Sequence, residues 1–552
     1  MHVKKSRTHL VLTVAFLAGA CTMTVELAAV RVLAPWFGTS SSVWTNVIGV
    51  VLLALSIGYL IGARASRSPR PRRALSRALF VAAVCAAALP FASAYVARWF
   101  LPEGLTLGEA GDLVRWGSLA SGACLFLPPA LALGCVAPLC AEILERDTIA
   151  RGDRASAGRA GGAVLCVGTL GSLLGTFGTT YAFVPALGLS RTFAGAAIVL
   201  AVLGLLVTFV GRERDEAQAS DGARASSREA IGAGLAALVA VGAALLAPRG
   251  GGPSLGTDMV LVDARESAVQ SVRVVETLGE PPRLRFLQVN ESFDSFQSVW
   301  QERAGFLPDG FYYNHFVFPL WWSHAIGTYR ILVVGMGAGS AWRVMEGARP
   351  TALSIDMVGA EIDPVVTELA QRHMDLPPAH PRCRVFAPLD GRAAVRASRE
   401  PLDMIVLDAY ANQMEIPAHL SSVEFFDECR EHLISGGWLC ANVGGFGLDD
   451  PVVDAVASSL ARAFGRRVLA LRVPFSRNVT LYVRRDGDPY EPLGPGWATG
   501  DADVDRRLSA ASLPGMWRWF EPTEGRVLTD DTNPIQELQR RSVETASAES
   551  VP

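Results

Sequence analysis

A glycine-rich segment in the second half of the 552-residue chain has the residue types and spacing of a nucleoside-binding turn. Gly335, Gly337 and Gly339 directly follow the apolar run Ile331–Val334, and a helical pattern begins just after them. Glycines between a buried strand and a helix allow the backbone to approach a bound nucleoside closely. We therefore predict that these three glycines contact a nucleoside, since glycines serving only a tight turn would not explain the acidic residues nearby.

Acidic residues follow the next two predicted strands. Glu361 stands at the end of one, where a carboxylate can accept both hydroxyls of a ribose, and Asp390 and Gly391 follow the other. The glycine spacing is not the GxGxxG of a dinucleotide site, and no P-loop lysine is present. The pattern predicts a site for a single adenosine-type ligand.

Asp408 is the strongest candidate for a group that takes part in chemistry. It follows the apolar run Met404–Leu407, which has the character of a buried strand. Open α/β sheets bind and transform substrates at the carboxyl ends of such strands. Because an unpaired buried carboxylate is costly, the alternative is a helix cap or a salt bridge.

Strands and helices that position these residues alternate through the second half, which predicts a mostly parallel sheet in an α/β, Rossmann-like domain over 255–541. A small antiparallel sheet precedes it, from short β-prone runs at Ser271–Glu276 and Leu284–Val289. Residues 542–552 have the composition of a polar tail.

The first half, residues 1–250, contains apolar runs long enough to cross a bilayer, which needs about 20 residues. It is predicted to be a multi-pass α-helical membrane domain. We expect seven spans: Leu10–Leu33, Val43–Ala63, Ala74–Trp99, Leu119–Ile143, Gly162–Leu187, Thr192–Val210 and Ala230–Ala247.

Basic residues gather before the first run and after the second, fourth and sixth, which places the N-terminus in the cytoplasm. Seven spans would then leave the α/β domain outside the cell. We expect instead a cytoplasmic domain, with the short run Ala230–Ala247 misassigned or re-entrant. The alternative is an enzyme that acts on exported substrates.

Composition excludes several classes of protein. Half of the residues are apolar and 19% are charged, with a mean hydropathy of +0.29, which is too apolar for an ordinary soluble enzyme. A net charge of −3 gives no general attraction to nucleic acid. The nine cysteines form no CxxC pair or zinc spacing, so we expect neither disulfides nor a metal site.

From about Asp263 to Glu537 the sequence resembles the spermidine synthases, the polyamine aminopropyltransferases. The apolar helices resemble those of the bacterial membrane-fused type. The segments that carry the resemblance are the Gln270 strand, the glycine loop, Glu361-Ile-Asp-Pro, Asp390-Gly391, the Asp408 strand, Glu26 with Arg31-Val-Leu-Ala-Pro-Trp-Phe-Gly, Ile416-Pro-Ala-His-Leu and Leu528-Thr-Asp530-Asp531-Thr-Asn-Pro.

The resemblance implies aminopropyl transfer from decarboxylated S-adenosylmethionine to an amine such as putrescine, giving spermidine and methylthioadenosine. Glu361 would hold the ribose, Asp390 the adenine amino group, and Asp408 would accept the proton. The co-substrate replaces any prosthetic group, and the partners implied are a small amine, the lipid bilayer and a possible second copy of the chain. Because a reference aspartate pKa of about 3.9 lies far below an amine's, about 10.4, we expect Asp408 to orient the amine and pass its proton on.

The chain departs from the family where the diamine and the donor's ammonium would be held. Ala338 and Ala411 stand where the family usually has aspartates, and Tyr313-Asn314-His315 aligns with its Tyr-His-Glu segment. Gln270, Tyr313, Asp530 and Asp531 are the substrate-binding candidates that remain, the last two if the C-terminal segment folds over the pocket. Two other classes stay open: a methyltransferase using intact S-adenosylmethionine, and a membrane protein that only binds or transports polyamines.

Overall fold

The computed structural model describes residues 2–37, 41–100, 107–150, 157–215, 258–267, 269–279, 282–289, 296–410 and 415–549, together with 239, 242 and 246. The chain divides into two compact units. One comprises Met1–Gly104 with Asp112–Pro253, and the other Ser254–Pro552 with Leu105–Gly111. The first is helical and the second is an α/β unit, as the sequence predicts.

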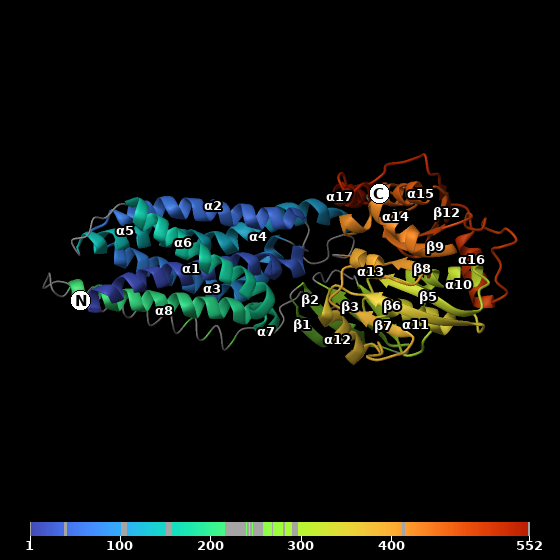
Figure 1. The fold of residues 1–552 in the computed structure, drawn as a ribbon, viewed down its shortest axis with the longest axis horizontal. Helices are drawn as coiled ribbons and strands as arrows, with labels where there is room; N and C mark the ends of the chain where they lie inside the picture. The colour runs from blue at the N-terminus through green and yellow to red at the C-terminus, as the bar shows by residue number, and fades with distance from the viewer. Residues whose placement is uncertain are drawn as a thin grey trace. The chain divides into compact units, whose positions relative to one another are not determined.

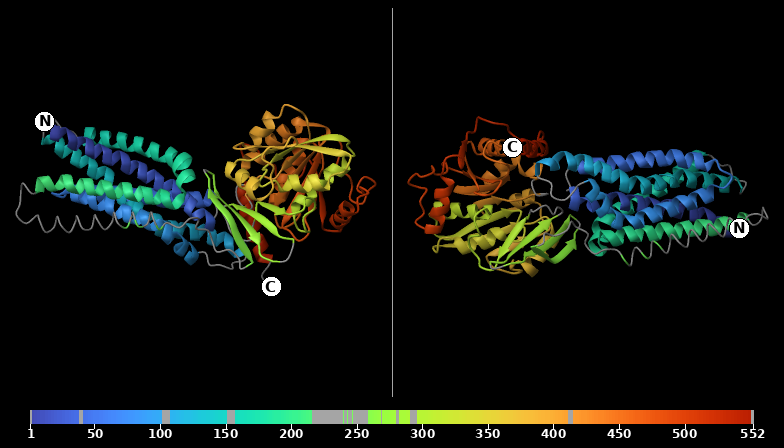
Figure 2. Two further views of the ribbon diagram at one scale, coloured as in Figure 1. Left: turned by 90° about the horizontal axis from the view of Figure 1, so that it is seen from below. Right: turned by 180° about the vertical axis from the view of Figure 1, so that it is seen from behind.

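The helical unit consists of long apolar helices that run alongside one another (Figures 1 and 2). Its elements are α1 (His2–Phe37), α2 (Ser41–Ser66), α3 (Pro71–Phe100), α4 (Leu107–Gly134), α5 (Val136–Ile149), α6 (Ala157–Gly178), the π-helix η1 (Thr179–Phe183), α7 (Val184–Leu187) and α8 (Leu189–Asp215). α4 and α5 together form one long span, and so do α6, η1 and α7.

Six segments within the described residues are long and apolar enough to cross a membrane. They coincide with the first six predicted spans. The seventh predicted span, Ala230–Ala247, lies outside the described residues except at positions 239, 242 and 246.

Glycines of α6 allow this helix to pack closely against α1. A Cβ added at Gly171 would lie 1.8 Å from the carbonyl oxygen of Phe16, and one added at Gly175 would lie 2.2 Å from that of Ala20. Small residues give close backbone contact where lipid supplies no hydrophobic force between helices.

Replacement of Gly171 should therefore destabilise the helical unit. We expect Gly171→Leu to cost about 1–3 kcal/mol or more, because the added side chain must push α1 away. Gly161→Ala is the matched control on the same helix, since its Cβ would meet no atom within 4 Å. Thermal unfolding in detergent measures both variants; equal midpoints would show that α1 and α6 do not pack in this way.

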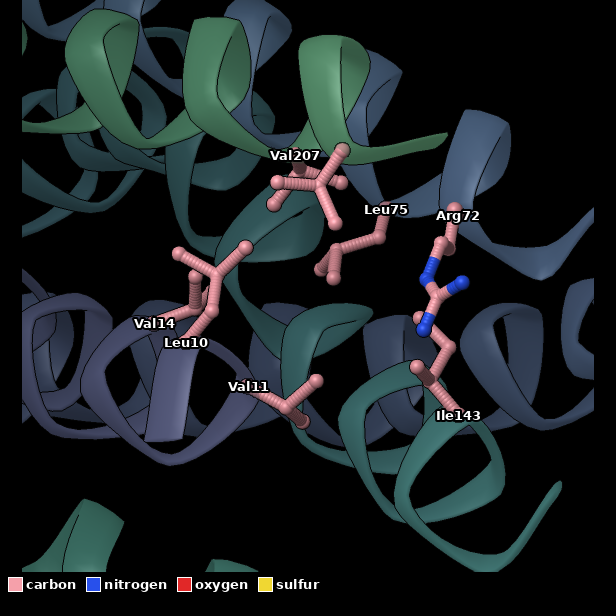
Figure 3. A pocket seen from close by; sticks show the side chains of 8 residues that line it. Leu10, Val11, Val14, Arg72, Leu75, Ile143 and Val207 are labelled. Carbon is pink, nitrogen blue, oxygen red and sulfur yellow. The ribbon is translucent and has the colours of Figure 1, made fainter. Parts of the chain in front are cut away.

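A small cavity inside the helical unit is lined almost wholly by apolar side chains (Figure 3). The exception is Arg72, whose guanidinium is ion-paired with Asp147 of α5. The lining is Leu10, Val11, Val14, Arg72, Leu75, Ile143, Val207 and Val210.

The α/β unit contains two sheets. The first comprises the antiparallel strands β1 (Met259–Glu266), β2 (Ser271–Thr277), β3 (Leu284–Val289) and β4 (Ser298–Gln301). The second comprises β5 (Gly327–Val334), β6 (Leu353–Ala360), β7 (Cys383–Phe386), β8 (Leu402–Leu407), β9 (Leu433–Gly444), β10 (Val468–Arg472), β11 (Asn478–Arg484) and β12 (Trp517–Phe520).

The order in this eight-stranded sheet is β12-β10-β11-β9-β8-β5-β6-β7. β7, β6, β5, β8 and β9 are parallel neighbours, and the other three strands pair antiparallel. The sheet is thus mostly parallel, as predicted. The chain order reverses between β5 and β8, where open α/β sheets bind ligands outside the carboxyl ends of the strands.

Helices cover both faces of the sheet (Figure 1). One core contains side chains from η2 (Tyr312–Val317), α10 (Phe318–Trp322), α11 (Ser340–Ala348), α12 (Pro364–His373) and α16 (Ala502–Ala511). The other contains side chains from α13 (Gly391–Ala397), η3 (Ala418–Leu420), α14 (Val423–His432), α15 (Pro451–Phe464) and α17 (Ile535–Glu549). From Met404 onward, even-numbered side chains of β8 face the first core and odd-numbered ones the second, which directs Asp408 toward η2.

The C-terminal end differs from the prediction. α17 continues to Glu549, so the position where a polar tail was expected to begin, Ser542, lies within a helix and is buried. Its hydroxyl is hydrogen-bonded to Asp450 at the start of α15. The apolar residues Ile535 and Leu538 pack α17 into the sheet's second core, and this packing extends order beyond what the polar composition indicates.

Candidate active site

The glycine loop lies against the end of β8. Gly335, Gly337 and Gly339 have φ values of 88°, 52° and 81°, which disfavour residues with a side chain. A Cβ at Gly335 would lie 2.3 Å from the carbonyl oxygen of Asp408. The Asp408 N–H donates to the carbonyl oxygen of Val334 at 2.8 Å. The structure thus brings the predicted nucleoside loop and the predicted acid–base residue together.

Glu361 directly follows β6 and supports the glycine loop. Its carboxylate accepts hydrogen bonds from the N–H groups of Gly337 at 2.8 Å and Asp363 at 3.0 Å, and the residue is only 7% exposed. Burial raises the pKa of Glu361 to about 7, although these N–H groups oppose the shift. Each oxygen retains a lone pair with which it can accept a further hydrogen bond.

Gln270 lies in the turn between β1 and β2, and this turn is fastened next to Glu361. The Ser267 hydroxyl lies 2.7 Å from Oδ2 of Asp363 and 3.0 Å from the carbonyl oxygen of Gln270. Asp363 also caps α12 by accepting from the Val365 N–H at 2.9 Å. The small sheet therefore contributes Gln270 near the end of β6.

Asp390 caps α13, which begins at Gly391. Its Oδ1 accepts from the N–H groups of Arg392 and Ala393 at 3.0 and 3.1 Å, and its Oδ2 lies 2.8 Å from Nε2 of His419. Burial would raise the pKa of Asp390, but the Ala393 N–H and His419 outweigh it and hold the pKa below its usual range. The outer oxygen, Oδ2, is the one directed away from the helix end.

Within the described residues, Asp408 receives two side-chain hydrogen bonds and is neither a helix cap nor half of a salt bridge. Asn442 Nδ2 lies 2.9 Å from its Oδ1, and the Tyr312 hydroxyl lies 3.2 Å from its Oδ2. Burial raises the pKa of Asp408 to about 8, because desolvation disfavours the carboxylate more than these two partners stabilise it. Asp408 is therefore a much stronger base than a reference aspartate.

The hydroxyl contacts next to Asp408 connect it to η2. Tyr313 donates to the carbonyl oxygen of Gln297 at 2.7 Å. The Tyr312 hydroxyl lies within donating distance of two acceptors, the Tyr313 hydroxyl at 2.8 Å and Oδ2 of Asp408 at 3.2 Å. Its hydrogen bond to Asp408 lowers the pKa of that carboxyl and so opposes the effect of burial.

Asn442 is held from its other side, at the end of β9. Its Oδ1 accepts from Nδ2 of Asn478 at 2.8 Å, and its backbone carbonyl accepts from the Tyr410 hydroxyl at 2.8 Å. Because Oδ1 is already used as an acceptor, the amide presents its NH₂ group to Asp408. Asn442 therefore acts as a fixed donor.

Three of the predicted substrate-binding residues make no direct hydrogen bond to the Asp408 carboxylate among the described contacts. Tyr313 is 2% exposed and reaches Asp408 only through Tyr312. Both oxygens of Asp530 accept from Arg392 at 2.8 Å, and Asp531 is exposed beside Thr532. The structure gives Asp530 a structural partner in place of the amine expected from the sequence.

An apolar pocket lies where the ends of β5, β8 and β9 meet α14 and α15. It is lined by Val334, Leu407, Ala409, Ile416, Leu420, Phe426, Ala441, Asn442, Val443 and Val456. Asn442 is its one polar lining residue and connects it to the Asp408 group.

Sequence reasoning missed Tyr312, Asn442, Arg392 and His419. Asn442 lies near the carboxyl end of β9, the parallel neighbour of β8. The argument from strand ends that selected Asp408 could therefore have found Asn442 as well. His419 lies in one of the segments quoted for the resemblance. Nothing in the sequence distinguishes Tyr312 from Tyr313, because only the geometry of η2 decides which hydroxyl reaches Asp408.

Comparison with known proteins supports the same family. Over 233 residues the chain is 28% identical to a probable polyamine aminopropyl transferase of Bifidobacterium longum, covering 40% of this chain and 50% of that protein. Over 118 residues it is 39% identical to a polyamine aminopropyltransferase of Vibrio vulnificus, covering 20% of this chain and 37% of that one. The predicted resemblance to the spermidine synthase family is confirmed. The matched regions span half or less of these aminopropyltransferases' own lengths.

Among solved structures, a probable spermidine synthase from Corynebacterium glutamicum is similar, with a TM-score of 0.39 and 17% identity, covering 50% of this chain and 97% of that one. No protein-family model matches the chain.

Proposed function

We propose that the protein is a membrane-bound aminopropyltransferase that moves an aminopropyl group from decarboxylated S-adenosylmethionine to a small amine such as putrescine. The observation that carries the proposal is the contact between the glycine loop and Asp408, which puts a nucleoside-type loop beside a carboxyl group of raised pKa. The sequence similarity to polyamine aminopropyltransferases supports the choice of reaction.

The nucleoside end of the site is formed by Gly335–Gly339, Glu361 and Asp390. Glu361 accepts hydrogen bonds from the ribose hydroxyls with its remaining lone pairs. Asp390 accepts one from the adenine amino group at Oδ2, the oxygen that His419 now contacts. Gly391 brings α13 close to β5, since a Cβ there would lie 2.3 Å from the Val334 side chain.

The amine end is formed by Asp408 with Tyr312 and Asn442. A pKa of about 8 leaves Asp408 only about two units below an amine near 10.4, instead of the six that its reference value implies. General base catalysis is efficient when the two pKa values are close. Asp408 is therefore basic enough to accept the amine's proton, the role that the resemblance implies for it, in addition to orienting the amine.

The reaction balances without any other reactant. The lone pair of the neutral amine forms the new N–C bond at the aminopropyl carbon next to sulfur, and the C–S bond electrons return to the sulfonium, which leaves as the thioether of methylthioadenosine. The proton on the new secondary ammonium passes to Asp408 and then to solvent.

The six apolar helices among the described residues support a membrane location. If Ala230–Ala247 does not cross, the number of crossings is even, and the basic loops then favour a cytoplasmic α/β unit, on the side where the donor nucleoside is made. A cysteine introduced at Ser547 should then resist a membrane-impermeant thiol reagent applied to intact cells. Labelling there would put the α/β unit outside.

Glu361→Gln should weaken binding of methylthioadenosine by roughly 1–3 kcal/mol, the cost of lost charge-assisted hydrogen bonds. The glutamine NH₂ group would also face a backbone N–H, either that of Gly337 or that of Asp363. Calorimetry with the full-length protein in detergent measures the affinity. An unchanged affinity would remove Glu361 from the nucleoside site.

Product analysis tests the reaction itself. Purified protein given decarboxylated S-adenosylmethionine and a panel of amines should release methylthioadenosine and an amine heavier by one aminopropyl group. A methylated product formed from intact S-adenosylmethionine would favour the methyltransferase alternative. Ligand binding with no released thioether would favour a binding or transport protein.

A further inference from the structure

The segment Leu528–Pro534, here called the C-terminal clasp, fastens η3 and the start of α14. The Val423 N–H donates to the carbonyl oxygen of Leu528 at 2.8 Å. The Asn533 amide donates to the carbonyl oxygen of Ala418 at 2.8 Å and to the Ser421 hydroxyl at 3.1 Å. Two segments about 110 residues apart in the chain are thus joined by side-chain and backbone hydrogen bonds.

Arg392 connects the clasp to Asp390. Its guanidinium binds both oxygens of Asp530 at 2.8 Å, pairs with Glu428 at 2.7 Å, and lies 3.4 Å from the carbonyl oxygen of His419. The Arg392 backbone N–H is one of the donors that Asp390 accepts as a helix cap. The Arg392 side chain is only 11% exposed, whereas that of Asp530 is 42% exposed, so the pair is held by bidentate geometry at the edge of the solvent.

The clasp therefore holds His419 from two sides. Asn533 binds the residue before it, and Arg392 lies beside its own carbonyl oxygen. The His419 ring in turn contacts Oδ2 of Asp390 at 2.8 Å, while Oδ1 is committed to the α13 cap. Oδ2 is therefore the oxygen of Asp390 that is available to a ligand. Its direction is set by His419, which the clasp holds in place.

We propose that Asp530 is a positioning residue for nucleoside binding: through Arg392 and η3, the clasp fixes His419 and Asp390 in the geometry that accepts the base. The inference rests on the proposed nucleoside site. It gives the late Asp530 segment a function other than gripping the amine. Both Asp530 oxygens are held by Arg392, and an incoming ammonium would have to break that pair.

A double-mutant cycle tests this coupling. Asp530→Asn and His419→Ala should each weaken methylthioadenosine binding by about tenfold in calorimetry, and the double variant by about tenfold rather than a hundredfold. Glu537→Gln is the matched control, because it removes an exposed carboxylate of α17 that pairs only locally with Arg540 and Arg541. Its affinity should equal the parent's.

Asn533→Ala provides a second route, since it opens the clasp without altering the charged cluster. It should also weaken binding, and its effect should likewise vanish in the His419→Ala background. Additive effects, or parent-like affinity in the folded Asp530→Asn or Asn533→Ala variants, would overturn the inference while leaving the nucleoside site intact. Failure of the parent protein to bind methylthioadenosine would contradict the proposed function itself.

Discussion

Asp408→Asn should lower turnover by roughly 10²-fold or more while leaving methylthioadenosine affinity near the parent value, following the usual size of general acid–base contributions. Asparagine preserves the shape of the side chain but cannot accept the amine's proton. Its NH₂ group would also face either Asn442 or Tyr312, both of which contact the Asp408 carboxyl oxygens. Steady-state rates with saturating donor and amine, together with calorimetry, measure the two effects.

Asp403→Asn is the matched control for this variant. Asp403 lies at the opposite end of β8, where its carboxylate accepts from the Arg330 N–H at 2.8 Å. The same chemical change at that position should leave turnover within a small factor of the parent. Parent-like turnover by Asp408→Asn would show that another group accepts the proton.

The rate should depend steeply on pH because Asp408 acts in its ionised form. Its pKa is raised to about 8, so the neutral acid predominates below that pH and the carboxylate above it. The contribution of Asp408 to turnover should therefore rise by about tenfold per pH unit up to roughly pH 8 and then level off. Between pH 6 and 8 this amounts to about a hundredfold.

Asn442→Leu separates this titration from that of the substrate amine. Asn442 lowers the Asp408 pKa by donating to Oδ1, so its removal should shift the profile to higher pH and slow the enzyme most at neutral pH. The groups that face Asp408 are Asn442 of β9, Tyr312 and Tyr313 of η2, Tyr410, and Cys440 of β9. The substrate amine titrates in the same way with the parent enzyme and with Asn442→Leu, so it causes no difference between their two pH profiles. Superimposable profiles would contradict the assignment.

The fold could be predicted because hydrophobic patterning determines it directly. Strand β3 coincides with the predicted run Leu284–Val289, and β2 extends the predicted run Ser271–Glu276 by one residue. Six apolar runs correspond to the six long apolar segments of the described residues. β6 ends at Ala360, and the two acidic residues that follow have other roles, because the Glu361 carboxylate binds the glycine loop and Asp363 caps a helix.

Only those site residues that directly follow a parallel strand could be predicted from the sequence. Gly335, Glu361 and Asp408 all directly follow parallel strands. In the structure the Gly335 backbone lies against the Asp408 carbonyl group, and the Gly335 N–H donates to the carbonyl oxygen of Ala360, next to Glu361. The partners of Asp408 come from η2 and β9, which are distant in sequence, so local patterns could not reveal them. A carboxylate such as that of Asp530 could bind an amine, and the sequence gives no sign that it has another partner. Only the structure shows that Asp530 is hydrogen-bonded to Arg392.

A competition between donors tests most directly whether the protein transfers an aminopropyl group. Purified full-length protein would receive equal amounts of decarboxylated S-adenosylmethionine deuterated in its propyl chain and S-adenosylmethionine deuterated in its methyl group, with putrescine as acceptor. Mass spectrometry would identify both the amine product and the released thioether. We expect deuterated spermidine and an equal quantity of methylthioadenosine, with both reduced at least a hundredfold in Asp408→Asn. Methyl-labelled product with S-adenosylhomocysteine, or no product in the presence of bound nucleoside, would contradict aminopropyl transfer.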